Sequence, residues 1–398
     1  MKEYPYQWRV LFLMSLAWSC GGLAHNCVAF LFPYFSGEFH LATAHNGYLT
    51  AMLALFWTFS IIVCGKKADE IGHVKVIVPG FLFGAGCLIA ASFCKHIVLL
   101  YGLTAGIGFG CGAMCSPSLS FLAEQCDPKN RGLFFGVAMS SFTLVGSAMG
   151  SIIFTRIGAS SIGWRGSYMV IALLVLFAAG MIFFLGRKIP RKRTEDTMEE
   201  THSFKELFAY RNVLLATILA CLSMMWFFSV ATYTILYLVE SKSMTVIVAG
   251  SIFASFGIGG FLGECLSPII SDYLGRKKVV MFAALFGAIA FFIFLFGTSN
   301  AVLMIALAIA AFFMSGITAI LTSVIPSESV PVHLVATATS FTPAAGELMG
   351  GVVGPIIVGV LTQVFMIEKI MNLLIMLPVL ILVGAILLKE TAPRVLRK

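Results

Sequence analysis

The sequence predicts an all-α membrane protein of twelve transmembrane helices in two pseudo-symmetric six-helix bundles, and three observations carry this prediction. Of the 398 residues, 59% are hydrophobic and 11% are charged, with a mean hydropathy of +0.98. Charges, proline, asparagine and glycine interrupt the apolar runs at intervals near the ~20 residues that one spanning helix needs. A loop motif recurs about half the chain later, which indicates two related halves. A single soluble core could not bury this much apolar surface.

The apolar runs define the twelve helices in chain order. No cleavable signal peptide is expected before the first of them, because that run is long and no small-residue cleavage pattern follows it closely. The first helix is therefore expected to insert directly. The predicted spans are residues 8–35, 47–65, 75–94, 97–122, 132–155, 166–186, 212–239, 245–270, 279–297, 300–325, 335–364 and 370–389.

The basic residues predict the orientation, since lysine and arginine favour the cytoplasmic side of short membrane loops. If both termini are cytoplasmic, 21 of the 26 Lys and Arg residues fall on the inside. We therefore expect a multi-pass protein of the inner membrane with both termini in the cytoplasm. The net charge of +8 follows from this topology, so membrane lipid is an expected partner and nucleic acid is not.

The long polar stretch from Arg187 to Arg211 predicts the domain organisation. It separates a first bundle, residues 1–186, from a second bundle, residues 212–398, and is read as a cytoplasmic linker over 187–211. A short helix is expected near residues 203–208. The ten cysteines lie in or at the ends of apolar runs without histidines at ligand spacing, so we expect reduced packing residues.

The recurring motif lies between the second and third spans of each half. Its two aspartates are 203 residues apart, and so are its second glycines. An aspartate at a helix end can accept hydrogen bonds from the N-terminal amides of a neighbouring helix, so the motif is a candidate gating latch. A polar cap that only sets the helix end is the alternative. The motif residues are Gly65, Asp69, Gly72 and Lys75 in GKKADEIGHVK, and Asp272, Gly275 and Arg276 in PIISDYLGRKK.

These residues resemble the major facilitator superfamily, whose hallmark is G-x-x-x-D-R-x-G-R-[RK] after the second span. Glu70 and Tyr273 stand where the family has arginine, and Pro268 replaces the leading glycine of the second copy. The resemblance covers the chain and implies a monomeric secondary transporter that works by alternating access, with its substrate site between the two halves near the bilayer midplane. Further matches are NRG from Asn130, GWRG from Gly163 and GIGFGCGAMCSP from Gly106.

Within the superfamily, the chain is similar to bacterial organic-anion symporters and sugar-acid carriers. The similarity lies in the glycine-rich fourth span and in the stretch from Ile325 to Gly351. Those carriers usually have a charged pair in the first span, where this chain has His25 and Asn26. Many have an arginine early in the fourth span, where Tyr101 stands. The resemblance implies a carboxylate or sugar acid as substrate, and an amino acid or nucleoside fits the missing arginine as well.

Two acidic residues, Glu264 and Glu347, lie deep inside predicted spans, whereas every Lys and Arg lies at a span end or in a loop. At a rise of ~1.5 Å per residue, Glu264 lies about 12 Å from Asp272, and Glu347 about 18 Å into its span. Burial without a cationic partner favours the protonated carboxyl group. Both glutamates are therefore candidate proton carriers. A protonated glutamate that is hydrogen-bonded across a static helix interface is the structural alternative.

His25 is the one histidine well inside a predicted span, and an imidazole titrates near neutrality. It is a candidate for proton coupling, either with Glu264 or through bound substrate, and a hydrogen bond to a neighbouring carbonyl is the alternative. Asn26 is a second candidate for substrate binding.

The seventh span contains an aromatic stripe, because Trp226, Tyr233 and Tyr237 fall on one helical face. The resemblance places the first and seventh spans along the central cavity, which makes these three residues substrate-binding candidates. Core packing is the alternative. Small polar residues complete the candidate set, namely Ser116 in the fourth span and Thr318 and Thr322 in the tenth.

Enzymatic chemistry is not predicted. The sequence has no phosphate loop ending in Gly-Lys-Ser/Thr, no His/Cys metal set and no nucleophile elbow, so no cofactor or metal is expected. The leading hypothesis is proton-coupled import of a small organic solute. Efflux of lipophilic cations is one alternative, although the fifth span lacks the Gly-Pro pairing typical of proton antiporters in the superfamily. A transporter-like ligand sensor is the other alternative.

Overall fold

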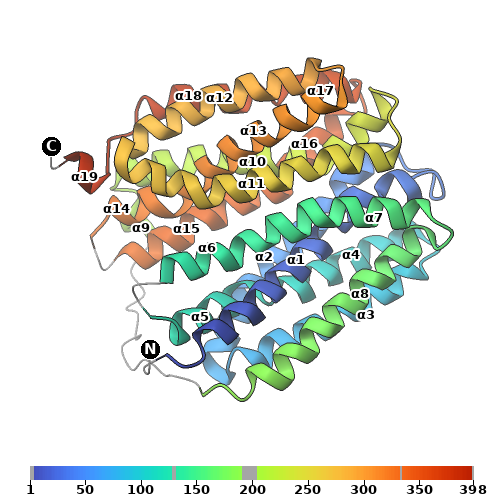
Figure 1. Cartoon of the computed structure of the whole chain (residues 1–398), viewed down its shortest axis with the longest axis horizontal. Helices are drawn as coiled ribbons and strands as arrows, with labels where there is room; N and C mark the ends of the chain where they lie inside the picture. The colour runs from blue at the N-terminus through green and yellow to red at the C-terminus, as the bar shows by residue number, and fades with distance from the viewer. Residues whose placement is uncertain (1–3, 128–130, 191–203, 332–333, 397–398) are drawn as a thin grey trace. The chain divides into compact units, whose positions relative to one another are not determined.

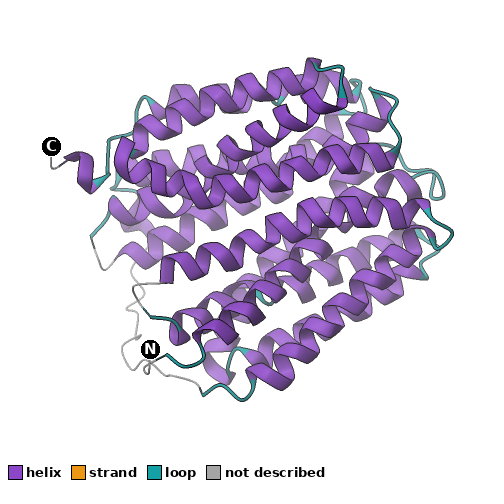
Figure 2. Cartoon of the chain, viewed as in Figure 1, coloured by secondary structure: helices purple, strands orange, loops and turns teal. Residues whose placement is uncertain are grey.

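The computed structural model describes residues 4–127, 131–190, 204–331 and 334–396, and the regular elements among them are all helices (Figure 2). Twelve helices or composite helical runs in these ranges are long and apolar enough to cross a membrane. The predicted fold class is thereby confirmed. In lipid a spanning segment must satisfy its own backbone hydrogen bonds, which is why apolar runs of this length form helices.

The first six spans are built from ten helical elements, which Figure 1 labels where space allows. Three of these spans are composite, because a kink or a wider π-helical turn divides them. The elements are α1 (Gln7–Phe35), α2 (Ala44–Ile71), α3 (Val74–Ser92), α4 (Ile97–Gly112), α5 (Cys115–Gln125), α6 (Arg131–Ser141), η2 (Phe142–Met149), α7 (Gly150–Ala159), α8 (Gly163–Met181) and η3 (Ile182–Gly186).

The last six spans repeat this construction after the short helix α9 (Phe204–Leu207), which lies in the predicted linker. Most of that linker, residues 191–203, lies outside the described residues, as does Asn130 of the NRG motif. The elements are α10 (Arg211–Glu240), α11 (Val246–Leu274), α12 (Arg276–Phe296), α13 (Asn300–Ala319), η4 (Ile320–Val324), α14 (Ile325–Glu328), α15 (Val335–Glu347), η6 (Leu348–Val353), α16 (Gly354–Leu361), α17 (Ile367–Leu373), α18 (Met376–Ala385) and α19 (Pro393–Leu396).

The chain forms two compact units. The first contains Met1–Glu195 and Met244–Ala254, and the second contains Asp196–Ser243 and Ser255–Lys398. In the first unit, α3 packs against α4 and α8, and α3 and α8 run side by side in Figure 1. In the second unit, α10 packs against α15, η6 and α18, and α12 packs against α13.

One close helix crossing occurs at equivalent places in the two units. In the first unit α1 packs against η2, and in the second α10 packs against η6. A Cβ at Gly146 would lie 2.5 Å from Gly22 Cα, and a Cβ at Gly350 would lie 2.6 Å from the backbone of Met224. Gly146 and Gly350 are 204 residues apart, close to the 203-residue offset of the loop motif. The repeat therefore extends from the loop motif to the packing of the helices.

Four helical segments in the described part of the chain have the wider π-helical winding, which a 3.6-residue pattern does not predict. They are η2, η3, η4 and η6, and each lies within a candidate span. Single π turns inside α-helices are often found at functional sites. Three of these segments border residues that the sequence singled out: η2 contacts the helix of His25, η4 contains Thr322, and η6 begins directly after Glu347.

The stretch GWRG has a defined structural role at the start of α8. Trp164 Nε1 donates to Glu38 Oε2 at 3.0 Å, and the Arg165 guanidinium binds both oxygens of the same carboxylate at 2.6 and 2.7 Å. The hydrogen bonds from Arg165 lower the pKa of Glu38. The loop after α1 is thereby fixed to the start of α8.

Gly72 and Gly275, the second glycines of the two loop motifs, adopt the same positive φ, +103° and +99°. A side chain at such a backbone conformation costs about 1–3 kcal/mol. At Gly275 a Cβ would also lie 2.5 Å from Glu390 Oε2, whereas nothing lies within 4 Å of a Cβ at Gly72. We expect Gly275→Ala to lower the melting temperature in detergent more than Gly72→Ala does. Equal shifts in the two variants would contradict the role assigned to Glu390.

Candidate functional site

Three hydroxyl side chains lie close together in the second unit: Ser223 on α10, Thr318 on α13 and Thr322 in η4. This group is called the hydroxyl ladder below. Ser223 Oγ on α10 lies 2.6 Å from Thr318 Oγ1 on α13, and Thr322 Oγ1 donates to the Thr318 carbonyl at 2.8 Å. Ser223 is fully buried, and Thr318 is partly buried. The structure thus brings the two predicted threonines together with Ser223, which the sequence did not single out. The ladder places hydroxyl groups where the helix of Thr322 passes into the π-helical turn η4.

Glu347 is the last residue of α15, and it lies beside the crossing of that helix with α10. The preceding residue, Gly346, faces the side chain of Met224, and Gly350 one turn later faces the Met224 backbone. Glu347 is partly buried, and it makes no hydrogen bond or ion pair with any described residue. Since α15 packs against both α10 and η4, this carboxyl group belongs to the same helix cluster as the hydroxyl ladder.

Glu264 occupies a similar position on α11. The preceding residue, Gly263, lies so close to α13 that a Cβ there would overlap the carbonyl oxygen of Phe312, and Gly259 lies equally close to Ala308. The closely packed face of α11 therefore runs through Gly259, Gly263 and Ser267. Glu264 itself is partly buried at the edge of this contact.

The aromatic stripe of α10 lies in the core of the second unit. Trp226 is fully buried and packs edge-on against Phe291, with ring centroids 5.1 Å apart. The Tyr233 hydroxyl donates to the Pro355 carbonyl at 3.2 Å, and the Tyr237 hydroxyl donates to the Leu295 carbonyl at 3.0 Å. Both tyrosine hydroxyls therefore hold neighbouring helices in this structure, and substrate binding by these residues stays a prediction.

His25 and Asn26 lie side by side in the core of the first unit. The His25 ring meets Trp57 and Phe142 edge-on, at 5.1 and 5.5 Å between centroids. Asn26 Nδ2 donates to the Gly22 carbonyl at 2.9 Å and contacts Ser147 Oγ at 3.4 Å. The two residues thus connect α1 with η2. Glu264, the suggested partner of His25, belongs to the second unit.

Ser116 packs against the first loop motif. Its Oγ would lie 2.8 Å from a Cβ placed at Gly65, so the small residue lets α5 approach α2. The neighbouring Ser118 Oγ accepts a hydrogen bond from Trp18 Nε1 at 2.9 Å. The structure therefore links Ser116 to the motif glycine.

The second loop motif is organised around the Arg276 guanidinium, whose side chain is 5% exposed. It binds Glu328 in a bidentate arrangement, at 2.9 and 3.2 Å, and also pairs with Asp272. Hydrogen bonds to Ser271 Oγ and the Pro268 carbonyl complete its environment. The carboxylate that accepts from the N-terminal amides of α12 is Glu390, at 2.7 Å from Arg276 N. Asp272 instead forms an ion pair with the Arg276 side chain.

The first loop motif has a histidine where the second has Arg276. His73 Nε2 lies 2.7 Å from Glu124 Oε1, and the imidazole stacks on Phe121. His73 is buried, Asp69 and Lys75 are exposed, and Lys67 pairs with Glu70 at the surface. Each motif thus connects the loop after its second span with an acidic residue at the end of the fourth span of its half.

The sequence reasoning missed the acidic partners of both motifs, although a signal for them was present. Glu124 and Glu328 are 204 residues apart, and His73 and Arg276 are 203 apart. These offsets lie within one residue of that of the motif aspartates. Comparing the two halves at this spacing would therefore have shown that Glu124 and Glu328 occupy corresponding positions. Glu390 has no equivalent signal, because its role depends on how the chain returns after α18.

These features together define a class of protein. Twelve spanning helices, a motif that recurs in both halves, and carboxyl groups inside the spans are typical of a secondary membrane transporter. The profile of the Major Facilitator Superfamily matches residues 10–342 and 234–398. The chain belongs to this superfamily, whose members are transporters and not enzymes.

Comparisons with single proteins agree with this assignment. The chain is 25% identical over 383 residues to the cis,cis-muconate transport protein of Acinetobacter baylyi, and the match covers 90% of this chain and 88% of that protein. It is 26% identical over 245 residues to the MFS-type transporter pynF of Aspergillus niger, which covers 61% of this chain and 55% of that protein. The chain thus spans about half the length of this fungal relative.

A solved structure has the same fold. It is a bacterial homologue of the human lysosomal transporter Spinster in an inward-facing and occupied conformation. The TM-score is 0.83 at 16% sequence identity, and the match covers 96% of this chain and 97% of that one. At this identity the similarity concerns the fold alone.

Proposed function

We propose that this protein is a proton-coupled symporter that imports a small organic acid by alternating access. In this proposal the chain lies in the inner membrane with both termini in the cytoplasm. The orientation rests on the 21 of 26 basic residues that this arrangement places inside. The two moving parts are the bundles of residues 1–186 and 212–398, joined by the linker 187–211.

The observation that carries the proposal is the position of Glu347. Its carboxyl group lies within a spanning segment, beside a helix crossing and directly before a π-helical turn, and it pairs with no described cation. An ionised carboxylate is costly in such surroundings, whereas the protonated form is tolerated. A site that is neutral when closed and ionised when hydrated is suited to carrying a proton across the membrane.

The same charge argument favours an acidic substrate that moves together with a proton. Every Lys and Arg of the sequence lies at a span end or in a loop, so no interior cation is available to balance a carboxylate substrate. A proton that moves with the anion removes this imbalance. The muconate transport protein, which is similar over most of its length, is named for an unsaturated dicarboxylate, and this supports a carboxylate as the first substrate class.

The remaining candidates take supporting roles in this proposal. Ser223, Thr318 and Thr322 offer hydroxyl groups that can donate to a carboxylate oxygen, since a Ser or Thr hydroxyl both donates and accepts. Glu264 is a second proton carrier. In the first unit, His25 and Asn26 contribute polar groups to substrate binding.

Uptake into proteoliposomes tests the proposal. Purified protein would be reconstituted and given labelled solutes, namely a dicarboxylate, an aromatic acid, a sugar acid, an amino acid and a nucleoside, with and without an acidic exterior. We expect accumulation of one of the acids, driven by the gradient. A gradient of one pH unit corresponds to about 1.4 kcal/mol, or about tenfold accumulation per proton. Uptake that ignores the gradient would remove the coupling, and proton release on addition of lipophilic cations would favour efflux instead.

A further inference from the structure

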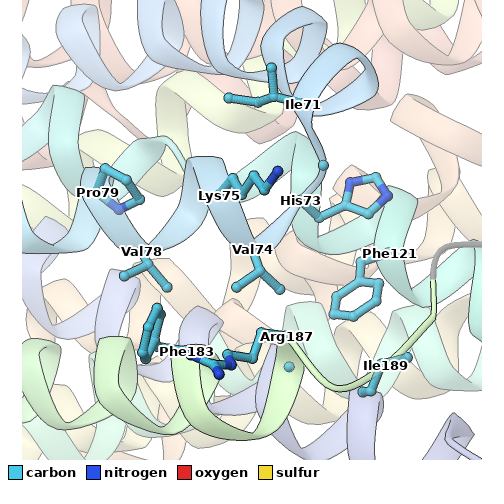
Figure 3. A pocket seen from close by; sticks show the side chains of 12 residues that line it. Ile71, His73, Val74, Lys75, Val78, Pro79, Phe121, Phe183, Arg187 and Ile189 are labelled. Carbon is cyan, nitrogen blue, oxygen red and sulfur yellow. The ribbon is translucent and has the colours of Figure 1, made fainter.

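The first unit contains a cavity of about 690 Å³ at the end that carries the first loop motif (Figure 3). A volume of this size is typical of sites that hold a small organic ligand. Its walls come from the end of α2, the start of α3, α5, η3 and the segment that follows η3. None of the candidate substrate-binding residues lines it. The cavity is therefore separate from these candidate residues.

The polar groups of the cavity are cationic. Lys75 on α3 and Arg187 beyond η3 lie on different walls in Figure 3, and both side chains are exposed. The Arg187 guanidinium carbon lies 5.1 Å from the centroid of the Phe183 ring, which holds this cation at the cavity wall. No acidic residue lines the cavity among the described residues. The carboxylate of Glu124 is bound to His73 and does not line the cavity.

The start of α3 adds a second source of positive potential. His73 is the N-cap residue of this 19-residue helix and makes no side-chain capping hydrogen bond. The amides in the first turn of a helix lack backbone partners, and together with the helix dipole they favour an anion. Since His73, Val74 and Lys75 all line the cavity, the helix start borders the same space as the two cations.

The rest of the wall is apolar, and exposed apolar side chains lie farther along the neighbouring spans. Val74, Val78, Phe121 and Phe183 line the cavity. Exposed apolar side chains follow on the same two helices, Leu82 and Phe83 on α3 and Phe177 on α8. A soluble anion would gain nothing from these surfaces, whereas a hydrocarbon chain would bury apolar area against them.

The wall formed by the segment after η3 is fixed by hydrogen bonds. Gln125 Nε2 at the end of α5 donates to the Pro190 carbonyl at 2.8 Å, and the Ile189 amide donates to the Gly186 carbonyl at 3.0 Å. Ile189, which lies in this segment, is buried and lines the cavity. The cavity therefore has a defined boundary on this side.

We propose that this cavity binds one anionic phospholipid of the cytoplasmic leaflet. The phosphate lies between Lys75, Arg187 and the first turn of α3, and one acyl chain follows Val74, Val78 and Phe183 toward the membrane-facing surface of α3 and α8. The proposal needs a membrane-embedded chain with this end at the cytoplasm, and it does not depend on the transported substrate. Neighbouring Lys188 is exposed but does not line the cavity, so it provides a matched control.

Native mass spectrometry of the full-length protein tests the proposal. Delipidated protein would be titrated in detergent with phosphatidylglycerol, phosphatidylcholine or glycerol 3-phosphate, and the bound molecules counted. We expect one tightly bound phosphatidylglycerol and weaker binding of phosphatidylcholine. A basic residue near an anionic lipid surface contributes about 1 kcal/mol, so Lys75→Gln and Arg187→Gln should each weaken binding about fivefold. Lys188→Gln should leave it unchanged.

A cavity-filling variant separates the cavity from surface charge. Val74→Phe keeps both cations and should lower the occupancy of phosphatidylglycerol, with its helical content checked by circular dichroism. If this variant does not fold, the comparison of Arg187→Gln with Lys188→Gln decides alone. Equal binding of phosphatidylcholine, equal effects of Arg187→Gln and Lys188→Gln, or tight binding of glycerol 3-phosphate would each overturn the proposal. The binding experiment does not measure transport, so a negative result for the lipid site would not contradict the proposed symport.

Discussion

Glu347→Gln is expected to abolish gradient-driven accumulation of substrate while leaving substrate exchange intact. Glutamine has nearly the same shape as a protonated glutamic acid, so the crossing of α15 with α10 should be retained. It cannot release a proton, so a carrier cycle that needs deprotonation would no longer be driven by the gradient. With an acidic exterior, the ratio of internal to external substrate should fall from as much as about tenfold per pH unit to one.

Two controls belong to this experiment. Glu368→Gln makes the same chemical change at an exposed position in α17 and should accumulate substrate like the unchanged protein. Counterflow, in which internal substrate drives uptake of labelled substrate without a gradient, should continue in Glu347→Gln. Full accumulation in this variant would assign Glu347 a structural role, and loss of both accumulation and counterflow would indicate general damage. The same pair of assays on Glu264→Gln decides between one proton carrier and two.

Arg276→Ala is expected to cause the largest loss of stability among the loop-motif substitutions. Arg276 is 5% exposed, and it pairs with Glu328, which is 19% exposed, and with Asp272. Removing one partner from a buried ion pair costs about 3–5 kcal/mol, because the remaining charge stays buried without compensation. Glu328 would keep only its hydrogen bond from Thr391 Oγ1 among the described residues. We expect a clearly lower melting temperature in detergent.

Lys278→Ala is the matched control for this substitution, since Lys278 is exposed two residues farther along the same helix. Exposed substitutions of this kind usually stay within about 0.5 kcal/mol. A triple variant with Arg276→Met, Glu328→Gln and Asp272→Asn removes all three charges and should recover part of the lost stability. Equal melting temperatures for Arg276→Ala and Lys278→Ala would mean that the ion network contributes little.

The spans were predictable because hydrophobic length is a local property. The membrane fixes the number of apolar residues per crossing. The charged, proline, asparagine and glycine residues between the apolar runs therefore located all twelve helices, for example Gln7–Phe35 against the predicted 8–35. The repeat was also visible, because one aspartate and one glycine recur at a constant offset. Neither inference required knowledge of which helices touch.

The packing faces were harder to predict, because they depend on the neighbouring helix. On α11, for example, the face in contact with α13 passes through Gly259 and Gly263, next to Glu264. In an apolar span nearly every face is compatible with burial, so periodicity alone does not select one. The π-helical turns were not predicted either, because a periodicity of 3.6 residues assumes one register along the whole helix and a π turn changes that register.

The sequence by itself determined the class of this protein: its twelve apolar segments, its two related halves, and the few acidic residues that the membrane-spanning segments contain. These follow from the cost of placing polar groups in lipid, which acts on each segment separately. Only the tertiary structure decided that Arg276 pairs with Glu328, that His73 pairs with Glu124, and that Ser223 joins Thr318 in the hydroxyl ladder. Such pairs depend on how distant helices approach one another, and local sequence carries no direct record of that distance.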